Sequence, residues 1–162
     1  MSSREPLAFA DHDHEGCRDR ALAEVRAVCA RRRVRLTPVR ARVLELLWQA
    51  HRPLRAYDLL ETLGREGFGS QPPVVYRALD FLIEQGFAHK IERLNAYLAC
   101  HCPGDAHGAK FLICTRCQRV AEFDDRAVAR ALDKVAEGSG FAIGKAMLEV
   151  EGLCPDCCKT PA

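Results

Sequence analysis

Residues 72–91 read PPVVYRALDFLIEQGFAHKI, and this stretch decides the fold expected for the first half of the chain. The two prolines at its start suit the first turn of a helix, and Gly86 marks where that helix stops. At 100° per residue, Val75, Leu79 and Leu82 fall within about 60° of one another and form an apolar stripe. The charged residues of the helix lie on the opposite face. The stretch therefore predicts an amphipathic helix with one buried face.

Three more helices are expected before this one, because apolar residues recur at helical spacing. In the second of them, Thr37 suits an N-cap and Pro38 a first helical position. Two short strand-like runs follow Gly86 and predict a β-hairpin. The expected bounds of the four helices and two strands are about 18–33, 38–49, 56–66, 70–85, 87–92 and 96–100.

Helices followed by a hairpin within about 65 residues are the order of a winged helix-turn-helix, in which the last helix lies in the major groove of DNA and the hairpin forms the wing. Residues 17–42 indicate phosphate contact, because they carry nine Arg against only Asp19 and Glu24. Two alternatives stay open: a merely solvated Arg-rich surface, and a three-helix module that binds protein.

The second half of the chain is predicted to mix strands and a helix, which makes the whole chain α+β. Its expected strands, helix and last strand cover about 111–113, 120–123, 125–137 and 141–150. Residues 101–108 are expected to be a hinge loop, and residues 1–17 a flexible tail. The predicted domains are therefore a winged-helix domain over 18–100 and a second domain over 109–162.

Composition narrows the class of protein further. Hydrophobic residues make up 48% of the chain and the net charge is +2, which suits a globular protein with a core. No apolar run approaches the roughly 20 residues of a membrane helix. The N-terminal residues lack a basic start followed by an apolar stretch, so a secretory signal is not expected either. We therefore expect a cytoplasmic protein that does not associate with a membrane.

Nine cysteines are an unusual number, and most of them fall in close clusters. In a reducing cytosol, close pairs of cysteines more often hold a metal than form a disulfide. Cys114-x-x-Cys117 and Cys154-x-x-Cys157 are two matched knuckles that can aim four thiolates at one tetrahedral ion. Such a closed site is structural, and its binding energy contributes to folding. Cys158 could replace Cys157, but the matched spacing favours Cys157.

A second group of potential ligands mixes nitrogen, sulfur and oxygen donors. It comprises His89, Cys100, His101, Cys102, Asp105, His107 and Glu122. Four of these could converge on one ion, and a mixed shell that includes a thiolate suits zinc better than a hard cation. Each residue alone also has an ordinary explanation as a surface side chain, so spacing leaves this second site open.

Several segments, taken together over about residues 18–158, resemble the ferric uptake regulator family of metal-sensing bacterial repressors. They read RLTPVR at 35–40, AYDLL at 56–60, PVVYRALDFL at 73–82 and EQGFAHK at 84–90, followed by the two knuckles. The match looks closest to the zinc-sensing branch of the family, the zinc uptake regulators. Val74 departs from the pattern, because the family helix usually has Thr at this place.

The resemblance implies an N-terminal winged-helix DNA-binding domain and a C-terminal α/β dimerisation domain. It implies about two Zn²⁺ per chain, one structural and one regulatory. The implied structural ligands are Cys114, Cys117, Cys154 and Cys157, and the implied regulatory ligands are His89, Cys100, His107 and Glu122. Because His101 lies next to Cys100, the choice of His107 as the histidine ligand stays open.

We therefore expect a zinc-responsive repressor that binds operator DNA as a homodimer and controls genes of zinc uptake and homeostasis. No enzymatic activity and no small-molecule substrate are expected. For DNA contact, Arg77 is the expected reader of a base edge, with Tyr57 and Tyr76 as secondary candidates. The alternatives are a sensor of iron, nickel or peroxide on the same scaffold, and a zinc-stabilised thiol protein. Cys100 argues against the iron and the peroxide sensor. A thiol enzyme would need a low-pKa cysteine at a helix N-terminus, whereas Cys114 follows a strand-like run.

Overall fold

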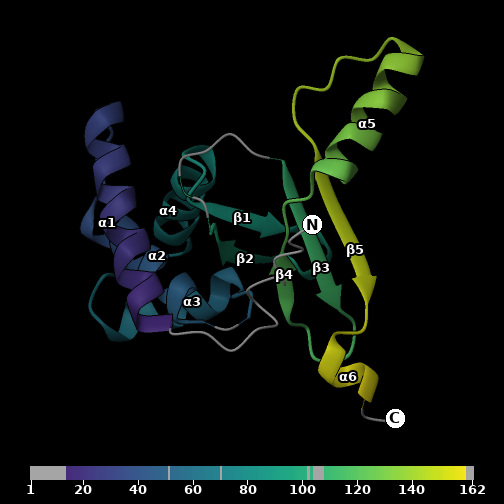
Figure 1. Cartoon of the computed structure of the whole chain (residues 1–162). Coiled ribbons are helices and arrows are strands. Elements are labelled where there is room, and N and C mark those ends of the chain that lie inside the picture. Colours follow the sequence, from purple (N-terminus) through teal and green to yellow (C-terminus); the bar gives the residue numbers. More distant parts are fainter. Residues whose placement is uncertain (1–13, 51, 70, 102, 104–107, 160–162) are drawn as a thin grey trace. The chain divides into compact units, whose positions relative to one another are not determined.

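The computed structural model divides the chain into two compact units, one within residues 11–106 and one that contains residues 107–162 (Figure 1). The described residues are 14–50, 52–69, 71–101, 103 and 108–159. Among the helices of this described part, none combines the length and the hydropathy that crossing a bilayer requires.

The first unit is a helical core followed by a β-hairpin. Its elements are α1 His14–Arg32, α2 Pro38–Gln49, α3 Ala56–Arg65, α4 Pro72–Glu84, β1 Ala88–Ile91, the 3-10 turn η2 Glu92–Leu94 and β2 Ala96–Ala99. The expected order of helices and hairpin is confirmed. Since α1 begins at His14, residues 14–17 belong to this helix rather than to the expected tail.

The apolar stripe of α4 lies at the centre of the core of this unit. Val75, Leu79 and Leu82 are each at most 1% exposed, as the helical spacing predicts. The other helices contribute side chains to the same cluster, among them Leu22, Val25, Val43, Leu44, Leu59 and Leu63. Because α2 and α3 pack against α4, the face of α4 opposite the stripe, with Arg77 and Asp80, is left exposed to solvent.

Local interactions fix the start of α2 and the geometry of the β1–β2 hairpin. Thr37 caps α2, where its side chain accepts from the Arg40 N–H at 3.4 Å, as predicted. β1 and β2 pair antiparallel, and Asn95 closes their turn in the left-handed region, which asparagine tolerates better than most residues. Two hydrogen bonds between the main chains of Leu54 and Tyr97 tie β2 to the segment before α3.

The second unit is a three-stranded sheet with one long helix. Its elements are β3 Ala109–Cys114, β4 Val120–Glu122, α5 Arg126–Ser139, β5 Met147–Gly152 and the short α6 Pro155–Lys159. The strand order is β4-β3-β5, with β4 antiparallel and β5 parallel to β3. β3 and β5 pair from Ala109 and Met147 to Cys114 and Gly152.

One expectation about this unit is wrong, and one short helix was not predicted. The last strand was expected over 141–150 but begins only at Met147, because its partner β3 starts at Ala109, directly opposite Met147. The alternation of apolar residues from Phe141 onward is therefore not the mark of a paired strand. The helix α6 was not expected, since five residues are too short a segment to show helical periodicity.

An ion pair between α2 and the end of α3 makes the stability of the first unit depend on pH. The Arg42 guanidinium donates to both carboxylate oxygens of Glu66, each at 2.7 Å, in a two-pronged contact. Hydrogen bonding to Arg42 is the main reason why the pKa of Glu66 lies below its ordinary value. A lowered folded-state pKa means that the stabilisation is present above the unfolded-state pKa. It is lost as the pH falls through the lowered value.

We therefore expect Glu66→Gln to reduce the free energy of unfolding modestly at pH 7, and the difference from the unmodified chain to vanish as the pH falls through the lowered pKa of Glu66. Urea unfolding followed by the fluorescence of Trp48, the single tryptophan, reports on this unit. Glu61→Gln is the control, because its pair with Arg65 is 70% exposed on both sides. A loss of stability that does not depend on pH would contradict the assignment.

Candidate functional site

The two knuckles of the second unit bring four cysteine sulfurs together. Cys114 ends β3 and Cys117 lies in the turn that follows, while Cys154 precedes α6 and Cys157 lies within it. The four sulfur atoms all lie within 4.8 Å of one another. Cys158 is exposed and is not a member of this group. The structure thus places all four cysteines of the predicted structural site in one cluster.

The register of the sheet explains why knuckles 36 residues apart in sequence meet. The parallel pairing of β3 with β5 sets Cys114 opposite Gly152, two residues before Cys154. The Thr115 N–H continues the ladder by donating to the Gly152 carbonyl at 2.8 Å. Each knuckle therefore begins where its strand ends, at the same edge of the sheet.

The distances in this cluster fit a zinc ion. A tetrahedral site with Zn–S bonds of about 2.3 Å has sulfur atoms about 3.8 Å apart. The Sγ atoms of Cys117 and Cys154, one from each knuckle, are 3.7 Å apart. The Cys154 N–H also donates to Cys114 Sγ at 3.4 Å, a contact typical of a sulfur that carries negative charge.

The pKa values of the cysteine thiols also indicate that the cluster holds a cation. Burial raises the pKa of Cys114, but main-chain N–H groups of Cys117, Cys154 and Arg116 outweigh it and lower the pKa to about 6. Desolvation and the three neighbouring sulfurs raise the pKa of Cys157 to about 12. Four thiolates therefore coexist near neutral pH only around a positive ion, and thiolates favour zinc over hard cations.

The first unit holds part of the second predicted site. His89 lies on β1 and Cys100 directly follows β2, and their ligand atoms lie within 4.8 Å of each other. The Cys100 N–H donates to the Phe87 carbonyl at 3.0 Å, which extends the hairpin and fixes the fully buried thiol. His101 instead packs edge-on against Trp48, with ring centroids 5.4 Å apart.

The other predicted ligands of this site are not in the first unit as described. Glu122 ends β4 in the second unit and is half-buried. His107, together with the weaker candidates Cys102 and Asp105, lies outside the described residues. The hairpin alone thus supplies one nitrogen and one sulfur donor, which is half of a tetrahedral shell.

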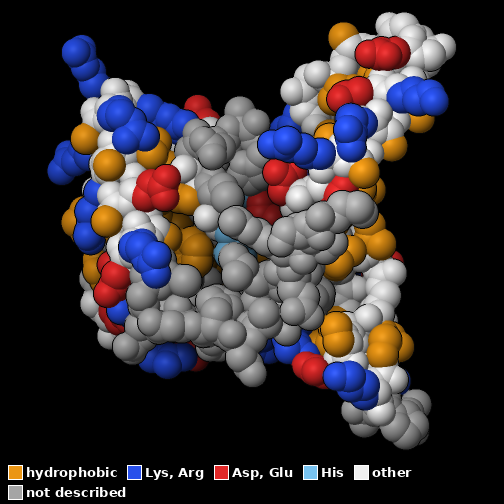
Figure 2. Space-filling view, in the orientation of Figure 1, with side chains coloured by type: hydrophobic (Ala, Val, Ile, Leu, Met, Phe, Trp, Pro, Cys, Tyr) orange, Lys and Arg blue, Asp and Glu red, His pale blue; other side chains and the backbone are white. Residues whose placement is uncertain are grey.

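The three candidate DNA contacts all reach the surface of the first unit. Tyr57, at the start of α3, is 78% exposed and Tyr76 on α4 is 46% exposed, which disfavours a core role for either. Arg77 is exposed on α4, and its Nε donates to the Pro73 carbonyl of the same helix at 3.2 Å. Arg side chains also gather over the face of α1 (Figure 2).

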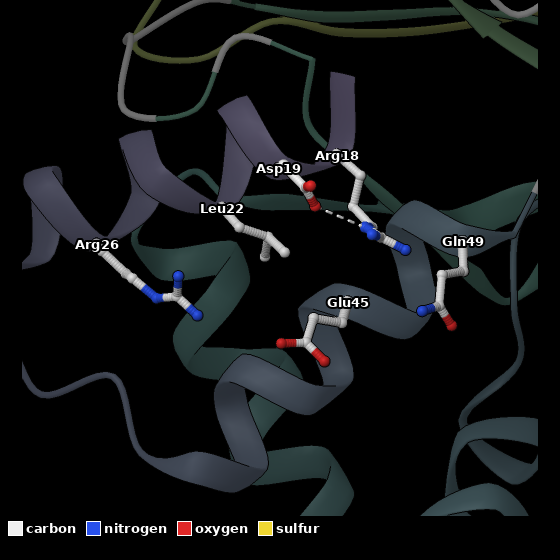
Figure 3. A pocket seen from close by; sticks show the side chains of 6 residues that line it. All are labelled: Arg18, Asp19, Leu22, Arg26, Glu45 and Gln49. Atoms are coloured by element: carbon white, nitrogen blue, oxygen red, sulfur yellow. Dashed lines mark hydrogen bonds and ion pairs between the residues drawn. The ribbon is translucent and has the colours of Figure 1, made fainter. Parts of the chain in front are cut away.

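A pocket between α1 and α2 is not a candidate metal centre. Figure 3 shows side chains of both signs around it, with Arg18 paired to Asp19 at 3.0 Å. Its lining residues are Arg18, Asp19, Leu22, Arg26, Glu45 and Gln49. None of these six carries the sulfur or imidazole donor that a zinc site prefers.

One contact of the four-cysteine cluster has no signal in the sequence. Arg119 donates to Cys154 Sγ at 3.4 Å and forms an ion pair with Asp156. An arginine two residues after a knuckle says nothing about a partner 35 positions away. Only the fold of the sheet reveals this contact.

The fold and the clusters of metal ligands define the class of protein: a winged-helix protein with a cysteine-rich second unit. Comparisons with known proteins identify the family. A model of the ferric uptake regulator family matches residues 31–151. The chain is 42% identical over 142 residues to the zinc uptake regulation protein of Escherichia coli K12, covering 87% of this chain and 83% of that protein. The ferric uptake regulation protein of Neisseria gonorrhoeae is 29% identical over 127 residues, 76% of this chain and 86% of that protein.

Solved structures agree with this match. A zinc uptake regulator complexed with zinc and DNA aligns with a TM-score of 0.82 at 40% identity, over 88% of this chain and 95% of that one. The structure of holo XcZur aligns with a TM-score of 0.76 at 45% identity, over 86% and 99% of the two chains. This chain belongs to the ferric uptake regulator family.

The four-cysteine cluster generates a direct test of its structural role. Cys114→Ser is expected to remove the bound metal and to unfold the second unit, because structural zinc contributes roughly 10–16 kcal/mol in small zinc domains. Metal content and limited proteolysis within residues 109–159 measure the two effects. Cys158→Ser, outside the cluster, is the control and should behave like the unmodified chain. A metal-loaded and protease-resistant Cys114→Ser chain would overturn the assignment.

Proposed function

We propose that this protein is a zinc-responsive, DNA-binding repressor of genes for zinc uptake and homeostasis. The observation that carries the proposal is the presence of two unlike donor sets. The second unit has a closed group of four sulfurs, whereas the hairpin of the winged-helix unit has an incomplete pair, His89 and Cys100. Similarity to the zinc uptake regulation protein of Escherichia coli supports zinc as the metal and transcription as the process.

The closed set is the structural site. Cys114 and Cys117 anchor it to the end of β3, and Cys154 and Cys157 anchor it to α6. A bound Zn²⁺ supplies the positive charge that four thiolates require. With all four positions taken by protein, no ligand position is open for catalysis, so the site supports a structural role and no enzymatic one.

The incomplete set is the regulatory site. We assign its remaining ligands to His107 and Glu122, on the strength of the family resemblance and of the carboxylate donor at the end of β4. These four residues belong to both units, so binding one ion restrains the arrangement of the units. All ligands must lose their protons, so binding strengthens as the pH rises through the His and Cys range. The buried Cys100 thiol disfavours an iron or peroxide sensor built on hard ligands.

The regulatory ion has to shift a conformational equilibrium. A change from about 1% to 99% of DNA-competent molecules needs about 5.5 kcal/mol of differential affinity. An ion whose shell is complete in only one arrangement of the units is able to provide this. In that arrangement α4 enters the major groove, the β1–β2 hairpin acts as the wing, and the Arg-rich α1 lies near phosphates. Since the DNA is its target, we place this repressor in the cytoplasm.

A homodimer follows from the apolar surface of the second unit. Hydrophobic side chains line α5 and β5 in Figure 2, and β5 is an edge strand of its sheet. The exposed members are Val135, Phe141, Ile143, Met147, Val150 and Leu153. An edge strand beside exposed apolar side chains pairs readily with another chain. A second copy of this unit covers them and presents two winged helices to two half-sites of double-stranded operator DNA.

The groove helix gives a test of DNA reading. Arg77→Ala is expected to cost about 1–3 kcal/mol in binding and to relax preference at one base position, because Arg pairs bidentately with guanine. Binding is measured on double-stranded DNA that the unmodified chain selects from a random pool, and on unselected DNA. Arg130→Ala on α5 is the control. Equal losses on both DNAs would make Arg77 a phosphate contact instead.

The hairpin ligands give a test of zinc sensing. Cys100→Ser removes the sulfur donor of the regulatory site and leaves the four-cysteine site intact. We expect a folded dimer with about one zinc per chain that no longer gains DNA affinity when zinc is added. Metal content and DNA binding with and without zinc are the measurements, and the neighbouring His101→Gln is the control. Normal zinc-dependent binding by Cys100→Ser would favour a sensor with His and carboxylate ligands for another metal.

A further inference from the structure

We propose that Arg119 is a positioning residue of the four-cysteine site, which clamps the sulfur of Cys154 from the end of the first knuckle and slows the release of the metal. The inference rests on the proposed metal occupancy of that site and adds a residue outside the ligand set to its function. Arg119 lies two residues after Cys117 and directly before β4. It is therefore held between the first knuckle and the sheet.

The guanidinium of Arg119 reaches from the end of the first knuckle to a sulfur of the second. Its Nη2 donates to Cys154 Sγ at 3.4 Å. That sulfur lies 3.7 Å from Cys117 Sγ of the first knuckle, so the contact is made where the two knuckles meet. Arginine presents several donors in a rigid geometry, which suits it for such a bridging contact.

A carboxylate holds this guanidinium in place. Nη2 of Arg119 also forms an ion pair with Asp156, which lies in the first turn of α6 between the two cysteines of the second knuckle. One nitrogen with two hydrogens thus joins a carboxylate and a sulfur of the same knuckle. The Arg119 side chain is 33% exposed, so the contact is partly shielded from water. Asp156 acts as the anchor of the clamp.

The charge of the loaded site explains what the clamp does. Four thiolates around one divalent cation carry a net charge of −2, and Cys154 is only 2% exposed. Hydrogen bonds from a permanently charged donor stabilise a buried anionic sulfur, and they compete with the solvent and chelators that displace it from the metal. Groups that hydrogen-bond to metal ligands change metal affinity by about 10–100-fold when they are removed.

A second arginine of the same knuckle provides a matched control. Arg116 lies between Cys114 and Cys117, and its Nη1 donates to the main-chain oxygen of Cys157 at 2.7 Å. Arg116→Gln removes one positive charge from the same knuckle, as Arg119→Gln does. It changes a contact to the main chain rather than the clamp on Cys154 Sγ. The pair of variants therefore separates hydrogen bonding to sulfur from overall charge.

The test measures metal release from the full-length chain. Each variant is treated with a mild chelator to empty the regulatory site, and zinc release to a stronger chromophoric chelator is then timed. Arg119→Gln is expected to release zinc at least about tenfold faster than the unmodified chain, Arg116→Gln within about twofold of it, and Arg119→Lys at an intermediate rate. Substitution with Co²⁺ gives a second readout, because its thiolate charge-transfer band should shift in Arg119→Gln but not in Arg116→Gln.

The outcomes are distinguishable. If the unmodified chain holds no metal at the four cysteines, the proposed function fails along with the inference. If it holds metal but Arg119→Gln releases it at the same rate with an unshifted Co²⁺ band, only the clamp is overturned. If Arg119→Gln does not fold, Asp156→Asn decides, because it keeps the guanidinium but removes its anchor. Faster release from Asp156→Asn supports the clamp, and an unchanged rate rejects it.

Discussion

The second unit depends on the parallel pairing of β3 with β5, which brings two cysteine knuckles to one edge of the sheet. Neither knuckle closes a metal site alone, and 36 residues separate them in the sequence. The pairing sets Cys114 opposite Gly152, so four sulfurs meet at tetrahedral spacing. An ion at this point links both ends of the segment that contains α5, and its loss leaves four mutually repelling or protonated sulfurs. The free energy of metal binding thus becomes free energy of folding.

The hairpin of the first unit differs from the four-cysteine cluster because it supplies only part of a metal site. Its main-chain pairing brings His89 and Cys100 together, but two donors are too few to hold zinc tightly. A weak, incomplete site on a DNA-binding hairpin is what a sensor needs, because occupancy then depends on metal supply and on where the remaining ligands are. In the proposed function, the closed site therefore stabilises the fold and the incomplete site responds to metal. Under this proposal one hairpin is both the wing and the source of two metal ligands, so no separate relay between them is required.

Much of this organisation is visible in the sequence, and the reasons are physical. Thr37 and Pro38 mark the start of α2, and the stripe of Val75 and Leu79 defines the buried face of α4. Matched Cys-x-x-Cys spacings mark the knuckles because this spacing by itself lets both sulfurs of a knuckle bind the same ion. Other features depend on tertiary pairing. The late start of β5, the short helix α6 and the contact of Arg119 with Cys154 follow from which strands lie side by side, and spacing alone does not encode this.

The central claim is that one ion holds the fold while a second controls DNA binding. Its most direct test is a zinc titration of the chain after mild chelation, with zinc per chain and binding to selected double-stranded DNA followed in the same samples. The account predicts a folded protein with about one zinc per chain and weak DNA binding at the start. Affinity should then rise in step with the second zinc. Strong DNA binding at one zinc per chain, with no change as the second ion binds, would contradict it.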